Sequence, residues 1–384
     1  MKKYILADKF FYPNRTRGKG YLEIVDGKFG RYFETLPEEN AEVVDYSGKW
    51  IAPGLVDTHI HGMLGVDVMD NKPEDVTTIM SEGLLKCGVT SFLPTTLTGD
   101  YDLLEEVARG IAENKELATG AKIQGIYFEG PHFTEEHKGA QNPKYFENPS
   151  IEQFKKWQKA AGGCIKKIAI APEREGAREY VRMLSEQGVV VALGHSNATY
   201  EQAADCVDAG ASVWVHTFNG MRGMTHREAG MVGAAMTLKH TFAELICDGH
   251  HVEPVACEVL MDKIGRDHIA LITDCMRAGA MPDGEYILGE FPVVVAQGMA
   301  RLKEGASLAG SVLELKDALK NVVAWNLATP EEAVEMASLI PAVSCKIDDK
   351  CGKIMAGRDA DFIVLDHEMN LCETYLNGIS RYKA

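Results

Sequence analysis

Two histidines one residue apart follow an apolar run near the start of the chain. Residues 51–57 are largely apolar, and His59 and His61 come directly after them. In a β-strand the side chains at positions i and i+2 point to the same side, so both imidazoles can reach one metal ion. Neutral imidazole is a common ligand of zinc, iron and related divalent metals. The spacing therefore predicts a metal site at the end of this strand.

Further apolar runs also end in residues that bind metals or transfer protons. Taken alone, a histidine after a strand is more often a hydrogen-bonded structural residue, and an aspartate there is often a helix N-cap. The joint pattern favours a functional site, because burying many ionisable groups together is costly unless they are paired or bind a metal. The residues are Glu129, His195, His216, Asp248, His251 and Asp274.

The middle of the chain alternates between apolar runs and helical patterns. Thr329 followed by Pro330 is typical of a helix start, and Gly210 of a helix end. This alternation favours a closed (β/α)8 barrel over the alternative of an open doubly wound sheet. In such a barrel the catalytic residues lie at the C-terminal ends of the strands, where the pattern puts them. The runs are 51–56, 89–93, 123–128, 165–170, 189–193, 212–215, 242–247 and 268–272.

Both ends of the chain have a different, β-rich pattern. Asp26-Gly27 lies between two short apolar runs, which is a strong hairpin signal, and Asn377-Gly378 has a similar setting. We therefore predict a small β-sandwich domain built from residues 1–50 and 344–384. The α/β part, a (β/α)8 TIM-like barrel of residues 51–343, would be inserted in it.

The composition is that of a globular enzyme. The chain has 384 residues, of which 46% are hydrophobic and 25% charged. Its formal net charge of -16 disfavours binding to nucleic acid or to an anionic membrane surface. No run approaches the ~20 apolar residues of a membrane span. The nine cysteines form no C-x-x-C pair, which is typical of reduced thiols, so we expect a cytoplasmic protein.

These motifs also carry a family resemblance. Over nearly its whole length the chain resembles the amidohydrolase superfamily, and within it the N-acetylglucosamine-6-phosphate deacetylases. Residues 53–61 match a motif of many amidohydrolases, whereas Glu129-Gly-Pro and His216-Thr-Phe-Asn219 with Arg227 are typical of the deacetylases. The resemblance implies metal-dependent hydrolysis of the acetamide of N-acetylglucosamine 6-phosphate to glucosamine 6-phosphate and acetate. That reaction belongs to amino-sugar catabolism and the recycling of cell-wall sugars.

For metal binding, the resemblance implies one or two divalent ions per chain. Glu129, His195 and His216 would bind the principal ion. His59 and His61 would hold a second ion, with Glu129 as the bridge. Zinc is the expected metal, with iron, cobalt or manganese as alternatives, because all of them accept these ligands.

The resemblance implies further roles around the metal. Asp274, which would also contact the metal, would take a proton from water and deliver it to the leaving amine. His251 would help to hold the oxyanion, and Arg227 would pair with the phosphate. The implied assembly is a homodimer, with the partner subunit near the phosphate. Substrate contacts are implied for Ala140, Gln141, Asn219, Gly220, Arg227, Asp248, His251, Leu308, Ala309 and Gly310.

Gln141 departs from the pattern of family members that have histidine at this position. A glutamine amide can donate a hydrogen bond, but it cannot act as an imidazolium. We therefore expect polarisation of the acetyl carbonyl to depend more on a metal ion at His59 and His61. The surrounding polar segment, 132–149, is long enough to be a lid over the site.

Two other functions stay open on the sequence alone. One keeps the barrel and changes the substrate to another N-acetylated sugar phosphate, a cyclic amide or a compound that is deaminated. The other is a metal-stabilised barrel without catalysis, against which the complete ligand set with Asp274 argues. Acetate release with and without a chelator separates these functions.

Overall fold

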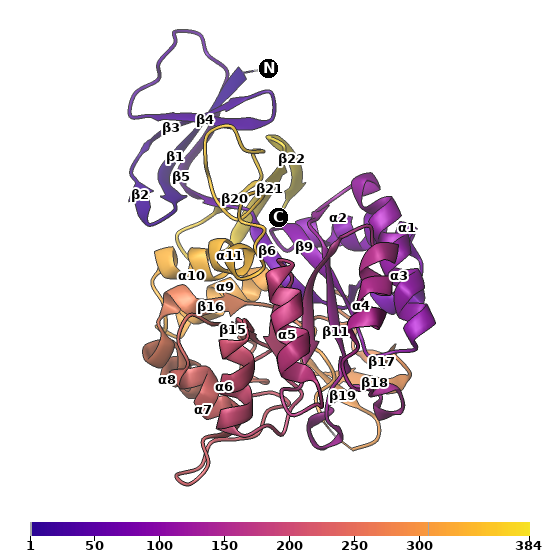
Figure 1. Cartoon of the computed structure of the whole chain (residues 1–384). Coiled ribbons are helices and arrows are strands. Elements are labelled where there is room, and N and C mark those ends of the chain that lie inside the picture. Colours follow the sequence, from indigo (N-terminus) through magenta and orange to yellow (C-terminus); the bar gives the residue numbers. More distant parts are fainter. Residues whose placement is uncertain (1, 306) are drawn as a thin grey trace.

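The computed structural model describes residues 2–305 and 307–384, which form a parallel barrel and a separate sheet (Figure 1). The barrel strands pair in parallel in chain order, and the short strand β10 (Lys122–Ile123) pairs in parallel with β9. The barrel closes where Ile60 forms a parallel bridge with Cys275. Its strands are β6 (Leu55–Ile60), β9 (Val89–Thr96), β11 (Ile126–His132), β12 (Ile165–Ile170), β13 (Val190–Leu193), β14 (Val213–Trp214), β15 (Phe242–Leu245) and β16 (Ile269–Leu271).

Helices cover the outside of the barrel, and most of them bury an apolar stripe against the rest of the fold. Capping boxes at Thr199 and Thr329 start α6 and α10, which confirms the helix start predicted at Thr329. A helical segment with a π turn (Val76–Met80) connects α1 (Pro73–Asp75) to α2 (Ser81–Leu85). The others are α3 (Tyr101–Asn114), α4 (Ile151–Ala160), α5 (Ala177–Glu186), α6 (Tyr200–Asp208), α7 (Gly230–Thr237), α8 (Pro254–Ile264), α9 (Leu315–Ala324), α10 (Pro330–Met336) and α11 (Leu339–Ser344).

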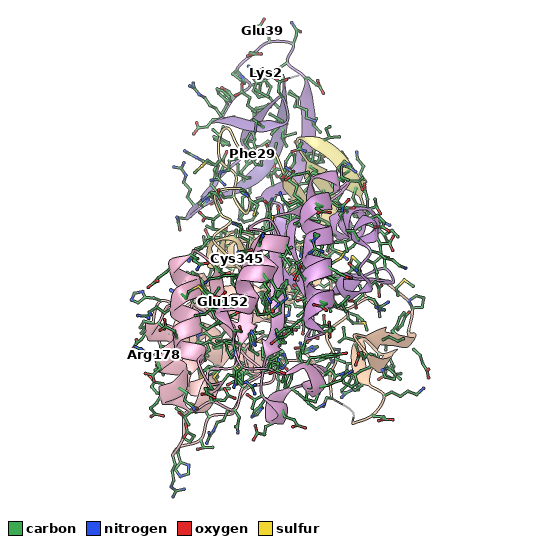
Figure 2. All side chains as sticks on the ribbon, turned by 45° about the vertical axis from the view of Figure 1, so that its right-hand side comes forward. Lys2, Phe29, Glu39, Glu152, Arg178 and Cys345 are labelled. Atoms are coloured by element: carbon green, nitrogen blue, oxygen red, sulfur yellow. The ribbon has the colours of Figure 1, made fainter. Side chains whose placement is uncertain are left out.

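Both ends of the chain form the separate sheet, as predicted. Its order is β22-β21-β20-β5-β1-β3-β4, with β2 paired to β1, and its strands enclose their own apolar core. Lys2 and Phe29 lie in this part of the molecule, and Cys345 lies nearer the barrel (Figure 2). The strands are β1 (Lys2–Tyr12), β2 (Arg15–Arg17), β3 (Gly20–Val25), β4 (Lys28–Phe33), β5 (Val43–Pro53), β20 (Phe362–Leu365), β21 (Leu371–Leu376) and β22 (Ile379–Lys383).

The first apolar run, predicted over 51–56, is shared between the two sheets. Residues up to Pro53 belong to β5 of the terminal sheet, and the barrel begins with Leu55 in β6. The start of β6 therefore faces the terminal sheet. Its end, which carries His59, lies at the opposite rim of the barrel.

A third sheet lies beside that rim (Figure 1). It consists of β17 (Gly284–Leu288), β18 (Phe291–Ala296) and β19 (Met299–Leu302) in antiparallel order. A two-stranded ribbon, β7 (Gly62–Met63) with β8 (Val66–Asp67), follows the first barrel strand. The three-stranded sheet was not predicted from the sequence. In the described part of the chain, no helix has the length and apolarity that a membrane crossing requires.

Candidate metal centre and active site

Six residues predicted as metal ligands meet at the C-terminal rim of the barrel in two adjacent groups, and Glu129 contacts residues of both. His195 Nε2 and His216 Nε2 each lie 3.1 Å from Glu129 Oε1. His61 Nε2 lies 3.3 Å from Glu129 Oε2 and 3.0 Å from Asp274 Oδ1. The groups are His59, His61 and Asp274, and Glu129, His195 and His216, and within each group the ligand atoms lie within 4.8 Å of one another.

The hydrogen bonds that close the barrel position the group of His59, His61 and Asp274. The backbone N–H of Asp274 donates to the carbonyl of His59 at 2.9 Å, and that of His61 donates to the carbonyl of Cys275 at 2.9 Å. These bonds join the end of the first barrel strand to the residues after the last. The His-x-His pair therefore faces Asp274 although more than 200 residues separate them in the sequence.

Three of the six residues have a left-handed backbone. The φ angles are 45° at His195, 27° at His216 and 51° at Asp274. Such a conformation costs a non-glycine residue about 1–3 kcal/mol and persists only where the surroundings enforce it. Ser311 enforces it at Asp274, whose carbonyl accepts the Ser311 N–H at 2.7 Å. Backbone strain at three ligand positions indicates that side-chain placement outweighs local stability there.

The donor atoms of the second group fit a cation. His195 Nδ1 lies 2.9 Å from the carbonyl of His137, and His216 Nδ1 lies 3.1 Å from the carbonyl of Asn219. Carbonyls only accept, so both Nδ1 atoms carry the hydrogen and both Nε2 atoms present lone pairs. These two Nε2 atoms are 3.0 Å apart and face Glu129. Lone pairs and a carboxylate this close repel one another unless a cation lies among them.

Charge at the first group favours a cation as well. Burial opposes protonation of His59, yet the carboxylates of Glu244, Asp274 and Glu129 raise the pKa of its imidazole to about 9. Burial opposes ionisation of Glu129, but the charge of the neighbouring His59 holds the pKa of Glu129 well below its usual range. His59 Nε2 is buried and has no hydrogen-bond partner. The site is thus an anionic pocket that presents an open imidazole nitrogen.

A cavity of about 300 Å³ opens over the two groups, within the size range of small-molecule sites. Predicted substrate contacts line it at Ala140, Gln141, Asn219, Gly220, His251, Leu308 and Gly310. Sequence reasoning missed four lining residues, which carry no catalytic signal of their own: Leu97, Gly139, Leu288 and Ser307.

His251 is held by a carboxylate behind it. Asp248 Oδ2 lies 2.6 Å from His251 Nδ1, and Asp248 Oδ1 also accepts the backbone N–H of His251 at 2.8 Å. Burial opposes ionisation of Asp248, but the hydrogen bond from His251 lowers the pKa of this carboxyl. Nε2 is then the ring nitrogen left for a ligand, and Asp248 positions this ring instead of lining the cavity.

Two other predicted contacts lie outside the cavity lining. Ala309 is fully buried beside it. Arg227 is exposed on the loop between Phe218 and Ala229, and the neighbouring Glu228 lies 3.7 Å from Arg222. Arg227 is therefore not part of the cavity lining of a single chain, and its contact with the phosphate stays a prediction.

The fold and these two groups define a barrel hydrolase of the metal-binding class. The chain belongs to the Amidohydrolase family, whose model matches residues 50–382, and it is an enzyme of this family. It is 39% identical to the N-acetylglucosamine-6-phosphate deacetylase of Vibrio furnissii, over 89% of this chain and 85% of that protein. It is also 39% identical to the N-acetylgalactosamine-6-phosphate deacetylase of Escherichia coli O157:H7, over 93% of each.

Comparison with solved structures also shows similarity to deacetylases. The N-acetyl-D-glucosamine-6-phosphate deacetylase of Mycobacterium smegmatis, solved as a mutant in complex with N-acetyl-D-glucosamine-6-phosphate, superposes with a TM-score of 0.93. That structure and this one match over their whole lengths at 28% identity. The predicted fold class, a (β/α)8 barrel with a β domain from both termini, is therefore confirmed.

Proposed function

We propose that this enzyme hydrolyses the acetamide of N-acetylglucosamine 6-phosphate, adding water across the C–N bond to give glucosamine 6-phosphate and acetate. The observation that carries the proposal is the pair of adjacent His and carboxylate groups beneath the cavity, with Glu129 in contact with both. The relatives at 39% identity, which carry deacetylase names, support the same reaction.

We infer that Glu129, His195 and His216 hold one divalent ion, and that His59, His61 and Asp274 hold a second. Zinc suits these nitrogen and carboxylate ligands, as do iron, cobalt and manganese. When bound, such an ion lowers the pKa of water to about 7 and polarises a carbonyl oxygen.

Asp274 is our candidate for proton transfer. It lines the cavity, and its Oδ1 lies 3.0 Å from His61 Nε2 and 3.5 Å from His59 Nε2. A carboxylate in this position can accept a proton from the attacking water and deliver it to the departing sugar nitrogen. His251, whose Nδ1 is engaged by Asp248, can direct Nε2 at the acetyl oxygen as charge develops there.

The phosphate needs a cation that a single chain does not supply. None of the described residues lining the cavity is lysine or arginine. We propose a homodimer in which the exposed loop of one subunit brings Arg227 to the cavity of the other. A guanidinium there would pair bidentately with phosphate oxygens.

N-acetylgalactosamine 6-phosphate is a second candidate substrate. The N-acetylgalactosamine-6-phosphate deacetylase and the N-acetylglucosamine-6-phosphate deacetylase are equally similar to the chain, at 39% identity. Acetate release should be measured with both 6-phosphates, with unphosphorylated N-acetylglucosamine and with each substrate after chelation. We expect turnover of N-acetylglucosamine 6-phosphate that disappears with the chelator. A clear preference for the galactosamine epimer would replace the proposed substrate, and absence of acetate from either would overturn the proposal.

A further inference from the structure

Lys167 and Glu244 form an ion pair inside the barrel, directly below the candidate metal centre. Lys167 lies on β12 and Glu244 on β15, and their side chains are 0% and 1% exposed. Lys167 Nζ contacts Glu244 Oε1 and lies 3.8 Å from the centre of the Tyr127 ring. Such complete burial means that solvent stabilises neither charge.

Stability alone does not account for this pair. Desolvating two charges is costly, and well-packed apolar side chains of similar volume are often equally or more stable than a buried ion pair. Apolar side chains pack in the same barrel interior, among them Val56, Leu93, Ala169, Val190 and Val213. An ion pair among these side chains calls for another role.

The free oxygen of Glu244 reaches both ligand groups. Glu244 Oε2 lies 3.0 Å from His59 Nδ1, and it accepts the backbone N–H of His216 at 3.2 Å. Lys167 Nζ faces Glu244 Oε1 and the backbone N–H of His216 faces Glu244 Oε2, and both of these groups can only donate. Both carboxylate oxygens therefore accept, so His59 carries a hydrogen on Nδ1 and its Nε2 is the ring nitrogen left for an ion.

This support distinguishes His59 from the other three candidate ligand histidines. The Nδ1 atoms of His61, His195 and His216 lie 2.9–3.1 Å from backbone carbonyls. Within the described residues, His59 is the member of this set whose Nδ1 rests on a carboxylate. A carboxylate behind a ligand imidazole fixes its tautomer and raises its basicity.

We propose that the Lys167–Glu244 pair is a positioning device for the first metal group. Lys167 holds Glu244 in place and balances its charge, and Glu244 orients His59 so that His59, His61 and Asp274 retain their ion. Neither residue touches the substrate. The inference rests on the proposed metal binding, but not on the identity of the sugar.

Two double variants separate positioning from stability. Glu244→Gln with Lys167→Met removes both charges but keeps an acceptor for His59. Glu244→Leu with Lys167→Met removes the acceptor as well, at similar volume. Glu373→Gln, a buried carboxylate of the terminal sheet that contacts Tyr46, is the matched control.

Each metal-free protein should be titrated with Co²⁺ alone, following its visible absorption, and unfolded with denaturant in parallel. We expect the leucine double variant to unfold at the parent's denaturant concentration or higher. Its affinity for one Co²⁺ equivalent should fall about 10- to 100-fold, the usual effect of losing such a partner. The glutamine double variant should keep most of the parent's affinity for Co²⁺, and Glu373→Gln should bind Co²⁺ like the parent.

Other outcomes overturn the inference. The leucine double variant could bind Co²⁺ like the parent, or both double variants could lose the same affinity for Co²⁺. The third such outcome is a parent protein that binds no Co²⁺. If the Co²⁺ titrations follow expectation but no acetate is released from either sugar phosphate, the proposed substrate fails and the positioning role stands.

Discussion

Gln141 holds the carboxylate of Glu129 from the cavity side. Gln141 Nε2 donates to Glu129 Oε2 at 2.5 Å, while Gln141 Oε1 accepts the backbone N–H of Thr98 at 2.8 Å. Because the Thr98 N–H can only donate, the amide oxygen must face it and the amide nitrogen must face Glu129. Gln141 thus orients the carboxylate that contacts both groups, and it also lines the cavity.

Replacing Gln141 with leucine should therefore slow turnover while metal remains bound. A hydrogen bond to a charged group contributes about 1.5–3 kcal/mol, so we expect kcat to fall roughly 10- to 100-fold. Glu129 keeps its contacts with the imidazoles, so the metal content after dialysis should match the parent. Gln124→Leu removes a glutamine that contacts Ser91 and serves as the control. Metal loss in proportion to activity would contradict this account.

Asp274→Asn should separate proton transfer from metal retention. Asparagine tolerates the φ of 51° at this position and keeps an oxygen toward His61, but it cannot accept the proton. We expect acetate release to slow by roughly 10²–10⁴-fold with metal content unchanged. Steady-state kinetics and elemental analysis of the same sample test this, and near-parent turnover would show that another group is the base.

Removing the metal should affect stability as well as activity. An ion that binds only the folded chain stabilises it by about 4 kcal/mol at a thousandfold excess over its Kd. We expect chelation to abolish acetate release and to lower the thermal unfolding midpoint. Adding back Zn²⁺, Fe²⁺, Co²⁺ or Mn²⁺ singly should restore both. An unfolding midpoint that does not respond to chelator or metal would contradict metal binding at these residues.

Arg227→Ala should weaken binding of phosphorylated substrate specifically. We expect KM for the 6-phosphate to rise about 10- to 100-fold, as for loss of a charged hydrogen bond, with little change for the unphosphorylated sugar. Sedimentation should show a dimer in both proteins. Arg178→Ala, on the exposed surface of α5, is the control (Figure 2). An unchanged KM for the 6-phosphate would remove Arg227 from the proposed site.

His132 should make the fold sensitive to mild acid. Burial lowers the pKa of His132 from 6.5 to about 4, and its Nδ1 lies 2.9 Å from the carbonyl of Glu147. Between these pH values the unfolded chain binds a proton that the folded chain excludes. The free energy of unfolding should therefore fall as the pH falls from 6.5 to 4, by up to about 3 kcal/mol from this group.

Denaturant unfolding from pH 7 to pH 4 measures this contribution. His132→Gln removes the titrating group, so its unfolding free energy should depend less steeply on pH than that of the parent. His226→Gln, at an exposed loop position, should retain the parent's slope. Parallel pH profiles for the parent and His132→Gln would rule out this contribution.

The sequence by itself determined the barrel and the residues that converge on its rim. Apolar runs that end in His59, Glu129, His195 and His216 suffice, because parallel strands of one barrel all end on the same side. The positions of these residues at strand ends therefore place their side chains on one rim of the barrel, even though the sequence gives no distances. The hairpin at Asp26-Gly27 was predicted for a similarly local reason, since both residues adopt positive φ there.

Only the tertiary structure decided which partner each side chain has. Lys167 and Glu244 lie within strands of the barrel core, where the spacing of the sequence does not reveal that they face each other. Gln141 meets Glu129 because of the path of the loop that carries it, and Arg227 lies on an exposed loop outside the cavity lining. Contacts between distant segments depend on how loops and strands pack in three dimensions, whereas periodicity reports only the local direction of each side chain.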